Sequence, residues 1–166
     1  MHEITYREAS PADYPAISEL MRQMGWVNCI AVPERFYRMI DNSSRTVVAL
    51  DESGIIGFAR AICDSESNGY ITDVAVSPSK QGRGVGRRLV TILMGDNPEI
   101  KWVITTAPAS RMFWEKLGFT TLHNAMEKKR ASQRPSKMHP YSQPDTNLFN
   151  KYVLGVVKKI YRFIKP

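Results

Sequence analysis

The sequence predicts an α/β domain with a mixed, mostly antiparallel central sheet flanked by helices, and with a C-terminal basic amphipathic helix. Three observations predict this architecture. Residues 46–62 hold two β-rich runs around a turn, residues 70–76 add a third, and apolar residues with helical spacing lie between the later β-type runs. The 166 residues, 43% hydrophobic and 23% charged, suffice for one folded domain. A membrane-spanning chain is disfavoured, because no apolar run approaches about 20 residues.

The N-terminal part is expected to form a strand and two helices. Residues 4–9 alternate apolar and polar side chains, as a half-buried strand does. A helix should begin at Ser10 and Pro11 and run to about Met24, because a capping hydroxyl, a proline that needs no amide partner and a first-turn acid come together there. A second short helix should begin at Pro33.

Two turns should separate the three antiparallel strands that follow. The first is expected at Asp51–Gly54, inside the β-rich segment 46–62. The second is expected at Asn68 and Gly69, which should turn the chain into the strand at 70–76.

The second half of the domain is expected to alternate helices and strands. Helical spacing covers 87–95 and 110–117, and each of these segments is closed by a glycine. A strand is expected at 101–106 and a final strand region at 119–129. A right-handed strand, helix, strand crossover should place 101–106 beside 70–76 and parallel to it.

The net charge of +7 lies entirely in the tail. Residues 1–129 hold 15 basic and 15 acidic side chains, whereas the rest of the chain holds 8 basic residues and one acid. This distribution predicts a domain over 1–129, a proline-rich linker over 130–147 and a basic amphipathic helix over 148–166. We expect this helix to pack on the domain or on a second subunit in a homodimer. An anionic membrane surface or RNA is the alternative partner.

Residues 76–90, VSPSKQGRGVGRRLV, join a β-type run to a helix-type run and contain three glycines and four basic residues. A glycine-rich turn into a helix exposes backbone amides at the positive end of that helix, which favours phosphate, and arginines add further donors. A P-loop is disfavoured, since no Lys-Ser or Lys-Thr pair follows the glycines. A dinucleotide fingerprint is disfavoured, since Arg87 stands where its third glycine belongs. A solvated basic turn is the remaining alternative.

Two segments resemble motifs of one enzyme family. Residues 71–90, ITDVAVSPSKQGRGVGRRLV, resemble the acetyl-CoA motif of the GNAT superfamily of N-acetyltransferases, and residues 109–119, ASRMFWEKLGF, resemble its second signature. The expected order of elements over residues 4–129 is also similar to the GNAT fold. The resemblance implies acetyl-CoA as co-substrate and a strand that diverges from its parallel neighbour. It implies that the cofactor is bound by Val74, Ala75, Val76, Gln81, Gly82, Arg83, Gly84, Val85, Gly86, Arg87, Ser110 and Phe113.

The reaction that the resemblance implies is direct attack of a primary amine, expected to be a small molecule, on the thioester. The Val74 amide would then be an oxyanion donor. Asp73 is the candidate base, because a carboxylate in an apolar strand is costly to bury unless it is paired or faces a cleft. A salt-bridged Asp73 is the alternative. Trp114 stands where family members commonly place a tyrosine acid, and indole is a poor proton source, so no residue is assigned that role.

Four aromatic residues are candidates for contact with the acceptor: Trp26, Tyr37, Tyr70 and Trp114. Packing in the core is the alternative for the last three. No metal site is predicted, because the histidines and the two cysteines lack ligand spacing. We expect reduced cysteines and a cytoplasmic protein, since the N-terminus lacks the layout of a secretory signal.

Two other functions stay open at this point. The missing tyrosine is compatible with a catalytically silent acyl-CoA-binding regulatory module. The basic tail is compatible with a transferase that acts on a macromolecule such as aminoacyl-tRNA, with the tail as its docking element.

Overall fold

The computed structural model describes residues 3–131, so the predicted helix over 148–166 and most of the predicted linker lie outside the described residues. The domain has a five-stranded sheet in the order β1-β2-β3-β4-β5. All neighbouring strands are antiparallel except β4 and β5, which are parallel, so the predicted fold class is confirmed. The elements in chain order are β1 (Thr5–Arg7), α1 (Tyr14–Gln23), α2 (Val27–Ile30), α3 (Pro33–Asp41), β2 (Arg45–Asp51), β3 (Gly54–Cys63), β4 (Asn68–Val76), α4 (Val85–Met94), β5 (Lys101–Ile104) and α5 (Arg111–Glu115).

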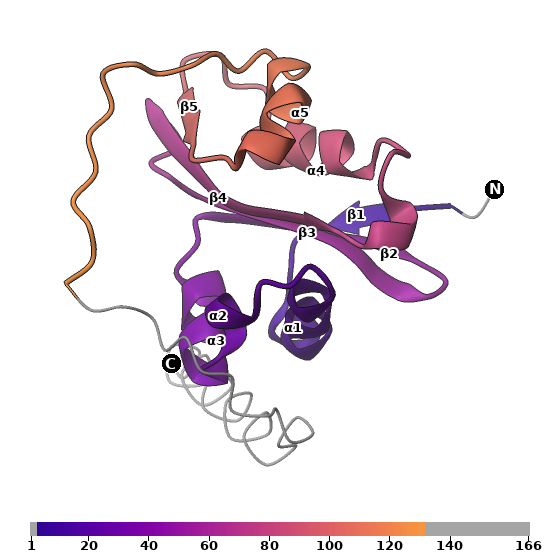
Figure 1. Cartoon of the computed structure of the whole chain (residues 1–166). Coiled ribbons are helices and arrows are strands. Elements are labelled where there is room, and N and C mark those ends of the chain that lie inside the picture. Colours follow the sequence, from indigo (N-terminus) through magenta and orange to yellow (C-terminus); the bar gives the residue numbers. More distant parts are fainter. Residues whose placement is uncertain (1–2, 132–166) are drawn as a thin grey trace, which may run out of the picture.

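Helices cover both faces of the sheet (Figure 1). On one face α1, α2 and α3 pack on a core that includes Phe36 and Phe58, both fully buried. On the other face α4 and α5 pack on a second core that includes Leu89 and Ile71. Because successive residues of a strand point to opposite faces, each central strand contributes to both cores. This double burial holds β3 and β4 rigidly at the centre of the domain.

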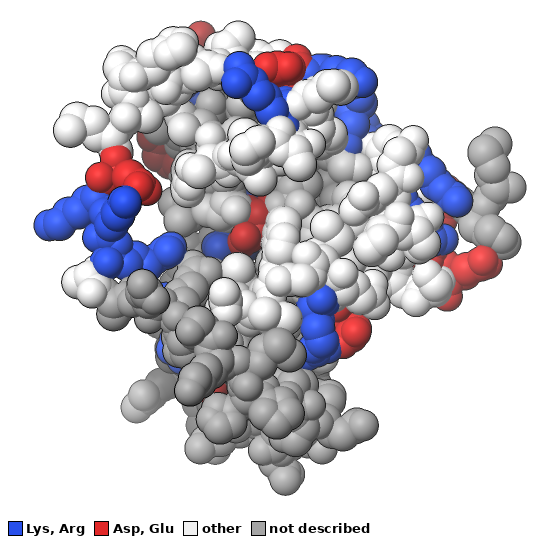
Figure 2. Space-filling view, in the orientation of Figure 1, with Lys and Arg blue, Asp and Glu red and all other residues white. Residues whose placement is uncertain are grey.

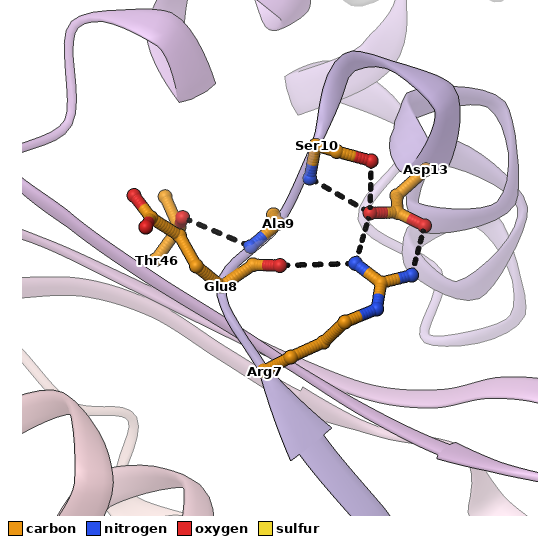
Figure 3. A network of polar contacts seen from close by, with 6 residues as sticks. All are labelled: Arg7, Glu8, Ala9, Ser10, Asp13 and Thr46. Carbon is orange, nitrogen blue, oxygen red and sulfur yellow. Dashed lines mark hydrogen bonds and ion pairs between the residues drawn. The ribbon is translucent and has the colours of Figure 1, made fainter.

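A polar network ties β1 to the start of the first helix (Figure 3). The Arg7 guanidinium donates two hydrogen bonds to the Asp13 carboxylate, at 2.6 and 2.7 Å. Asp13 also accepts hydrogen bonds from the Ser10 backbone amide at 2.7 Å and the Ser10 hydroxyl at 2.8 Å. The hydrogen bonds from Arg7, followed by those from Ser10, lower the pKa of Asp13 to about 2. The expected helix start is therefore present, as a short 3₁₀ turn at Pro11–Asp13 that leads into α1.

The turn before β4 lies earlier in the chain than expected. Asn68 and Gly69 are the first residues of β4, so the prediction that they form the turn is wrong. The turn is instead organised by the Asp64 carboxylate, which accepts hydrogen bonds from three successive backbone amides, those of residues 66–68. Gly69 serves close packing, because a Cβ at this position would lie 2.3 Å from the Trp102 ring.

The final strand predicted in residues 119–129 is not formed. These residues have no strand assignment, and side chains such as Leu122 and Met126 are exposed. A segment is not ordered as a strand when it buries no face, because nothing then offsets the lost backbone entropy. The short helix α2 was not predicted, since its four residues are too few to show a periodicity.

None of the helices within residues 3–131 is both long enough and apolar enough to cross a membrane.

Candidate functional site: a fork in the sheet

The sheet opens at the middle of β4. β4 and β5 pair from Asn68 with Lys101 to Ile71 with Ile104, and the pairing ends there although β4 continues to Val76. A bulge lies at this point, because Ala61 pairs with Ile71 while Arg60 pairs with Asp73. A bulge bends its strand and increases its twist, which turns the rest of β4 away from β5. The divergence of these strands, expected from the family resemblance, is thus present.

Thr72 is the extra residue of the bulge. Its hydroxyl donates a hydrogen bond of 3.0 Å to the Arg60 carbonyl on the neighbouring strand, which stabilises the distorted ladder. Thr72 also lines the pocket that opens at the fork. The bulge therefore both creates the site and contributes to its wall.

Beyond the bulge, the amides of Val74 and Val76 face the open side of the fork. The Ser77 amide donates to the Ile56 carbonyl of β3 at 2.8 Å, so Ser77 points its backbone groups toward β3. Backbone groups alternate in direction along a strand, and the amides of Val74 and Val76 must point the other way. The Val76 carbonyl confirms this direction, since it accepts a hydrogen bond of 3.0 Å from the Gln81 side chain.

The glycine-rich turn leads directly from this fork into α4. Gly82 and Gly84 have φ values of +73° and +83°, and a Cβ on either would meet no atom within 4 Å. Gly84 is the N-cap of α4, and its carbonyl accepts the first helical hydrogen bond, from the Arg88 amide. The amides of the first helical turn therefore have no partner within α4 and carry its positive dipole end.

A pocket of about 570 Å³ joins the fork to the glycine turn. Of the predicted site residues, the structure places these along its wall: Trp26, Asp73, Val74, Val76, Gln81, Gly82, Gly84, Val85, Gly86, Arg87, Ser110, Phe113 and Trp114. Four predicted site residues do not line it, namely Ala75, Arg83, Tyr37 and Tyr70. Ala75 and Tyr37 are buried in the core beneath α1 and α3. The volume suits a ligand of drug or cofactor size.

Asp73 is held by an ion pair with Arg60 of β3. The Arg60 Nε donates to the Asp73 carboxylate, and both side chains are largely buried, at 8% and 13% exposed. Arg60 also donates to the Ser43 hydroxyl at 3.2 Å, at the end of α3. The salt-bridged alternative for Asp73 is therefore present, and this carboxylate nevertheless reaches the pocket wall.

Trp114 is a packing residue at the edge of the pocket. It is 6% exposed and makes edge-on contacts with Phe113 and Phe119, with ring centroids 5.0 and 5.2 Å apart. Among the described residues that line this pocket there is no tyrosine and no histidine. In residues 3–131 no group of three His, Cys, Asp or Glu side chains could hold a metal ion.

Several lining residues were missed by the sequence reasoning: Met24, Thr72, Lys80, Ile104, Thr105, Thr106, Ala107, Ala109 and Lys116. Residues 104–107 follow from the parallel pairing of β4 with β5, so a closer use of that prediction would have found them. Lys80 is bound by the Asp51 carboxylate of the β2–β3 hairpin, a contact across 29 residues that no local pattern signals.

Comparison with known proteins agrees with this geometry. The model of the acetyltransferase (GNAT) domain matches residues 42–121. An uncharacterized N-acetyltransferase, ycf52 of Pyropia yezoensis, is 30% identical over 111 residues. The match covers 62% of this chain and 62% of that relative, so this chain spans less than two thirds of the relative's length.

Two solved structures share the fold at lower identity. A GNAT family acetyltransferase from Streptococcus pneumoniae has a TM-score of 0.62 at 21% identity, over 80% of this chain and 99% of that one. An aminoglycoside N-acetyltransferase in complex with CoA also has a TM-score of 0.62, at 18% identity, over 80% of this chain and 97% of that one. The family resemblance is thus confirmed over the matched region: residues 42–121 match the GNAT acetyltransferase domain, and the described residues have the fold of GNAT acetyltransferases.

Proposed function

We propose that this chain is an N-acetyltransferase that uses acetyl-CoA to acetylate a primary amine, expected to be a small molecule. The observation that carries the proposal is the continuous pocket from the fork of β4 and β5 to the free N-terminus of α4. Such a pocket offers main-chain donors at two places, one for an acyl group and one for phosphates. The named activities of the relatives support it as analogy.

The residues present fit the diphosphate of a coenzyme A thioester. Gly82 and Gly84 leave open space where any larger residue would place a Cβ, so an anion can approach the backbone. The unpaired amides of the first turn of α4 face that space, and Arg87, Lys80 and Lys116 add positive charge to the wall. Hydrogen bonds from charged donors to phosphate are roughly twice as strong as neutral ones. This chemistry matches the pyrophosphate and not an apolar ligand.

The fork would hold the reacting end of the co-substrate. The amine nitrogen forms a bond to the acetyl carbonyl carbon, and the carbon to sulfur bond breaks. Overall the nitrogen loses one proton and the sulfur gains one, so the N-acetylated amine and the free thiol of CoA are formed. The Val74 amide points into the fork and would stabilise the negative charge that develops on the carbonyl oxygen, an effect of about 3–4 kcal/mol for one well-placed donor.

We propose that the Asp73 carboxylate binds the amino group of the acceptor and acts as its base. It stands one residue before Val74 and reaches the pocket wall. Its ion pair with Arg60 fixes the position of its side chain, so a cationic or proton-releasing amine would meet a preorganised acceptor oxygen. Water would protonate the leaving thiolate of coenzyme A. No side chain is needed for this step because the thiolate is a good leaving group, and Trp114 is a buried packing residue.

The charge distribution favours a small acceptor over RNA. Most of the face of the described domain seen in Figure 2 is formed by uncharged residues, and the basic and acidic side chains lie mainly at its rim, with acids beside bases. Proteins that bind nucleic acid present a continuous basic surface, and residues 1–129 are balanced in charge. Docking of RNA on the tail, a homodimer and a cytoplasmic location stay predictions.

Release of free thiol from acetyl-CoA in the presence of primary amines tests the proposal. We expect saturable thiol release with at least one class of amine, and acetylated product by mass spectrometry. Binding of CoA with no thiol release across a broad amine panel would establish the silent regulatory module instead. Loss of RNA retention together with preserved thiol release after removal of residues 130–166 would point to a macromolecular acceptor.

A further inference from the structure

An apolar surface lies on the sheet just outside the fork. Ile62 of β3 pairs with Tyr70 of β4, and Tyr70 pairs with Val103 of β5, so these three residues stand side by side across three strands. Side chains of paired residues share a face of the sheet. We name these three residues the shelf. Ile62 is 55% exposed and Tyr70 41% exposed near the ends of their strands, and Val103 is half-buried.

The shelf shares its face with Asp73. Ile62 stands two residues after Arg60 on β3, so both point to the side covered by α1, α2 and α3. The helices cover Arg60, whose guanidinium donates to the Ser43 hydroxyl, but leave the shelf exposed. Asp73 and the exposed side chains of Ile62 and Tyr70 therefore lie along one strip of the same face of the sheet.

The strip is continuous with the pocket at the fork. The Tyr70 hydroxyl is hydrogen-bonded to the Thr105 hydroxyl at 3.0 Å, and Thr105 lines the pocket together with Asp73. Asp73 and Tyr70 are three residues apart on β4, which places their side chains within about 10 Å of each other. A molecule with its nitrogen at the fork would thus extend over the shelf.

The far end of the strip disfavours a second positive charge. Lys101 pairs with Asn68 two residues beyond the shelf on β5, and so it lies on the same face. Its ammonium would repel a second ammonium of the same ligand, whereas a neutral apolar body would meet only Ile62, Tyr70 and Val103.

We propose that the shelf binds the body of the acceptor, and that the acceptor is a monoamine whose amino group is carried on an aryl or alkyl chain. This proposal rests on the acetyltransferase function proposed above and adds the class of its substrate. Asp73 meets the amino end, the aromatic ring of Tyr70 and the side chain of Ile62 cover the apolar body, and Lys101 selects against diamines.

The first test compares acceptors. With the full chain and saturating acetyl-CoA, thiol release should be at least about tenfold greater in kcat/KM for 2-phenylethylamine or hexylamine than for ethanolamine or putrescine. Equal or reversed rates would overturn the proposal.

The second test changes the shelf. Ile62→Ser should raise the KM for 2-phenylethylamine several-fold and leave the Kd for CoA unchanged. Met126→Ser is the matched control, because Met126 is 99% exposed and is not part of the pocket wall. Both positions are exposed, so both variants should fold. An Ile62→Ser variant with the preference of the unmodified chain would overturn the proposal.

A binding measurement separates this proposal from the proposed function. In methyl NMR of the full chain with CoA present, 2-phenylethylamine should shift the Ile62 methyl resonance, and putrescine should not. A shift without thiol release would support the shelf and refute the transferase. Thiol release without a shift would support the transferase and refute the shelf.

Discussion

Replacement of Gly84 by alanine should have two separate effects: backbone strain that lowers the Tm, and weaker binding of the CoA diphosphate. Gly84 has φ +83°, and a Cβ there would meet no atom within 4 Å, so the substitution introduces no clash within the protein. The cost in stability is the left-handed conformation alone, about 1–2 kcal/mol. For a domain of this size that corresponds to a fall in Tm of roughly 3–10 °C.

The same methyl group would project into the open space at the start of α4, where we place the diphosphate. We expect the Kd for CoA to rise at least about tenfold, equivalent to about 1.4 kcal/mol. Isothermal titration of CoA into the folded variant, well below its Tm, measures this change.

Gly118→Ala is the matched control for strain. Gly118 has φ +89° and also has no atom within 4 Å of a Cβ, but it follows α5 and does not line the pocket. It should lose about as much Tm as Gly84→Ala and bind CoA like the unmodified chain. Equal CoA affinity in both variants would refute the placement of the diphosphate beside Gly84.

Two further predictions concern ion pairs. Asp13→Asn should lower the free energy of unfolding by about 1–2 kcal/mol at pH 7, a value reduced for the half-exposed Arg7. Because the pKa of Asp13 is lowered to about 2, its contribution is complete above its ordinary pKa of 3.8 and is lost as pH falls from about 4 to about 2. The free energies of unfolding of the unmodified chain and of Asp13→Asn, measured with urea, should therefore converge over that pH range. A difference of constant size would contradict the stabilising role of the Asp13 carboxylate. Asp51→Asn removes the carboxylate that neutralises Lys80 on the pocket wall and should lower the Kd for CoA about threefold by titration calorimetry; an unchanged or higher Kd would show that the Lys80 charge does not act on the phosphates.

The glycine turn was predictable because its conformation depends on local backbone chemistry. Gly82 and Gly84 occupy positive φ, which few other residues tolerate, and the helix that follows shows its own periodicity. The strand order was predictable for a similar reason, since turns and crossover rules act over short stretches of chain.

The bulge at Thr72 was not predictable from the sequence. It is a difference in register between two strands, and the pairing of Arg60 with Asp73 and of Ala61 with Ile71 arises only when both strands are in place. The ion pair between Arg60 and Asp73 could not be predicted for the same reason. From the sequence, Asp73 could therefore be either a candidate base or a salt-bridged residue. The strand predicted over 119–129 fails for another reason, because residues 120–129 are exposed and bury no face against the sheet.

The most direct test of the account is an amide NMR titration of the full chain with CoA. The account predicts that the largest shifts fall on the amides of Val74 and Val76 at the fork and of Gly84, Val85 and Gly86 at the start of α4. Saturable binding with these amides unmoved, or with the largest shifts on the opposite edge of the sheet at β1, would contradict it.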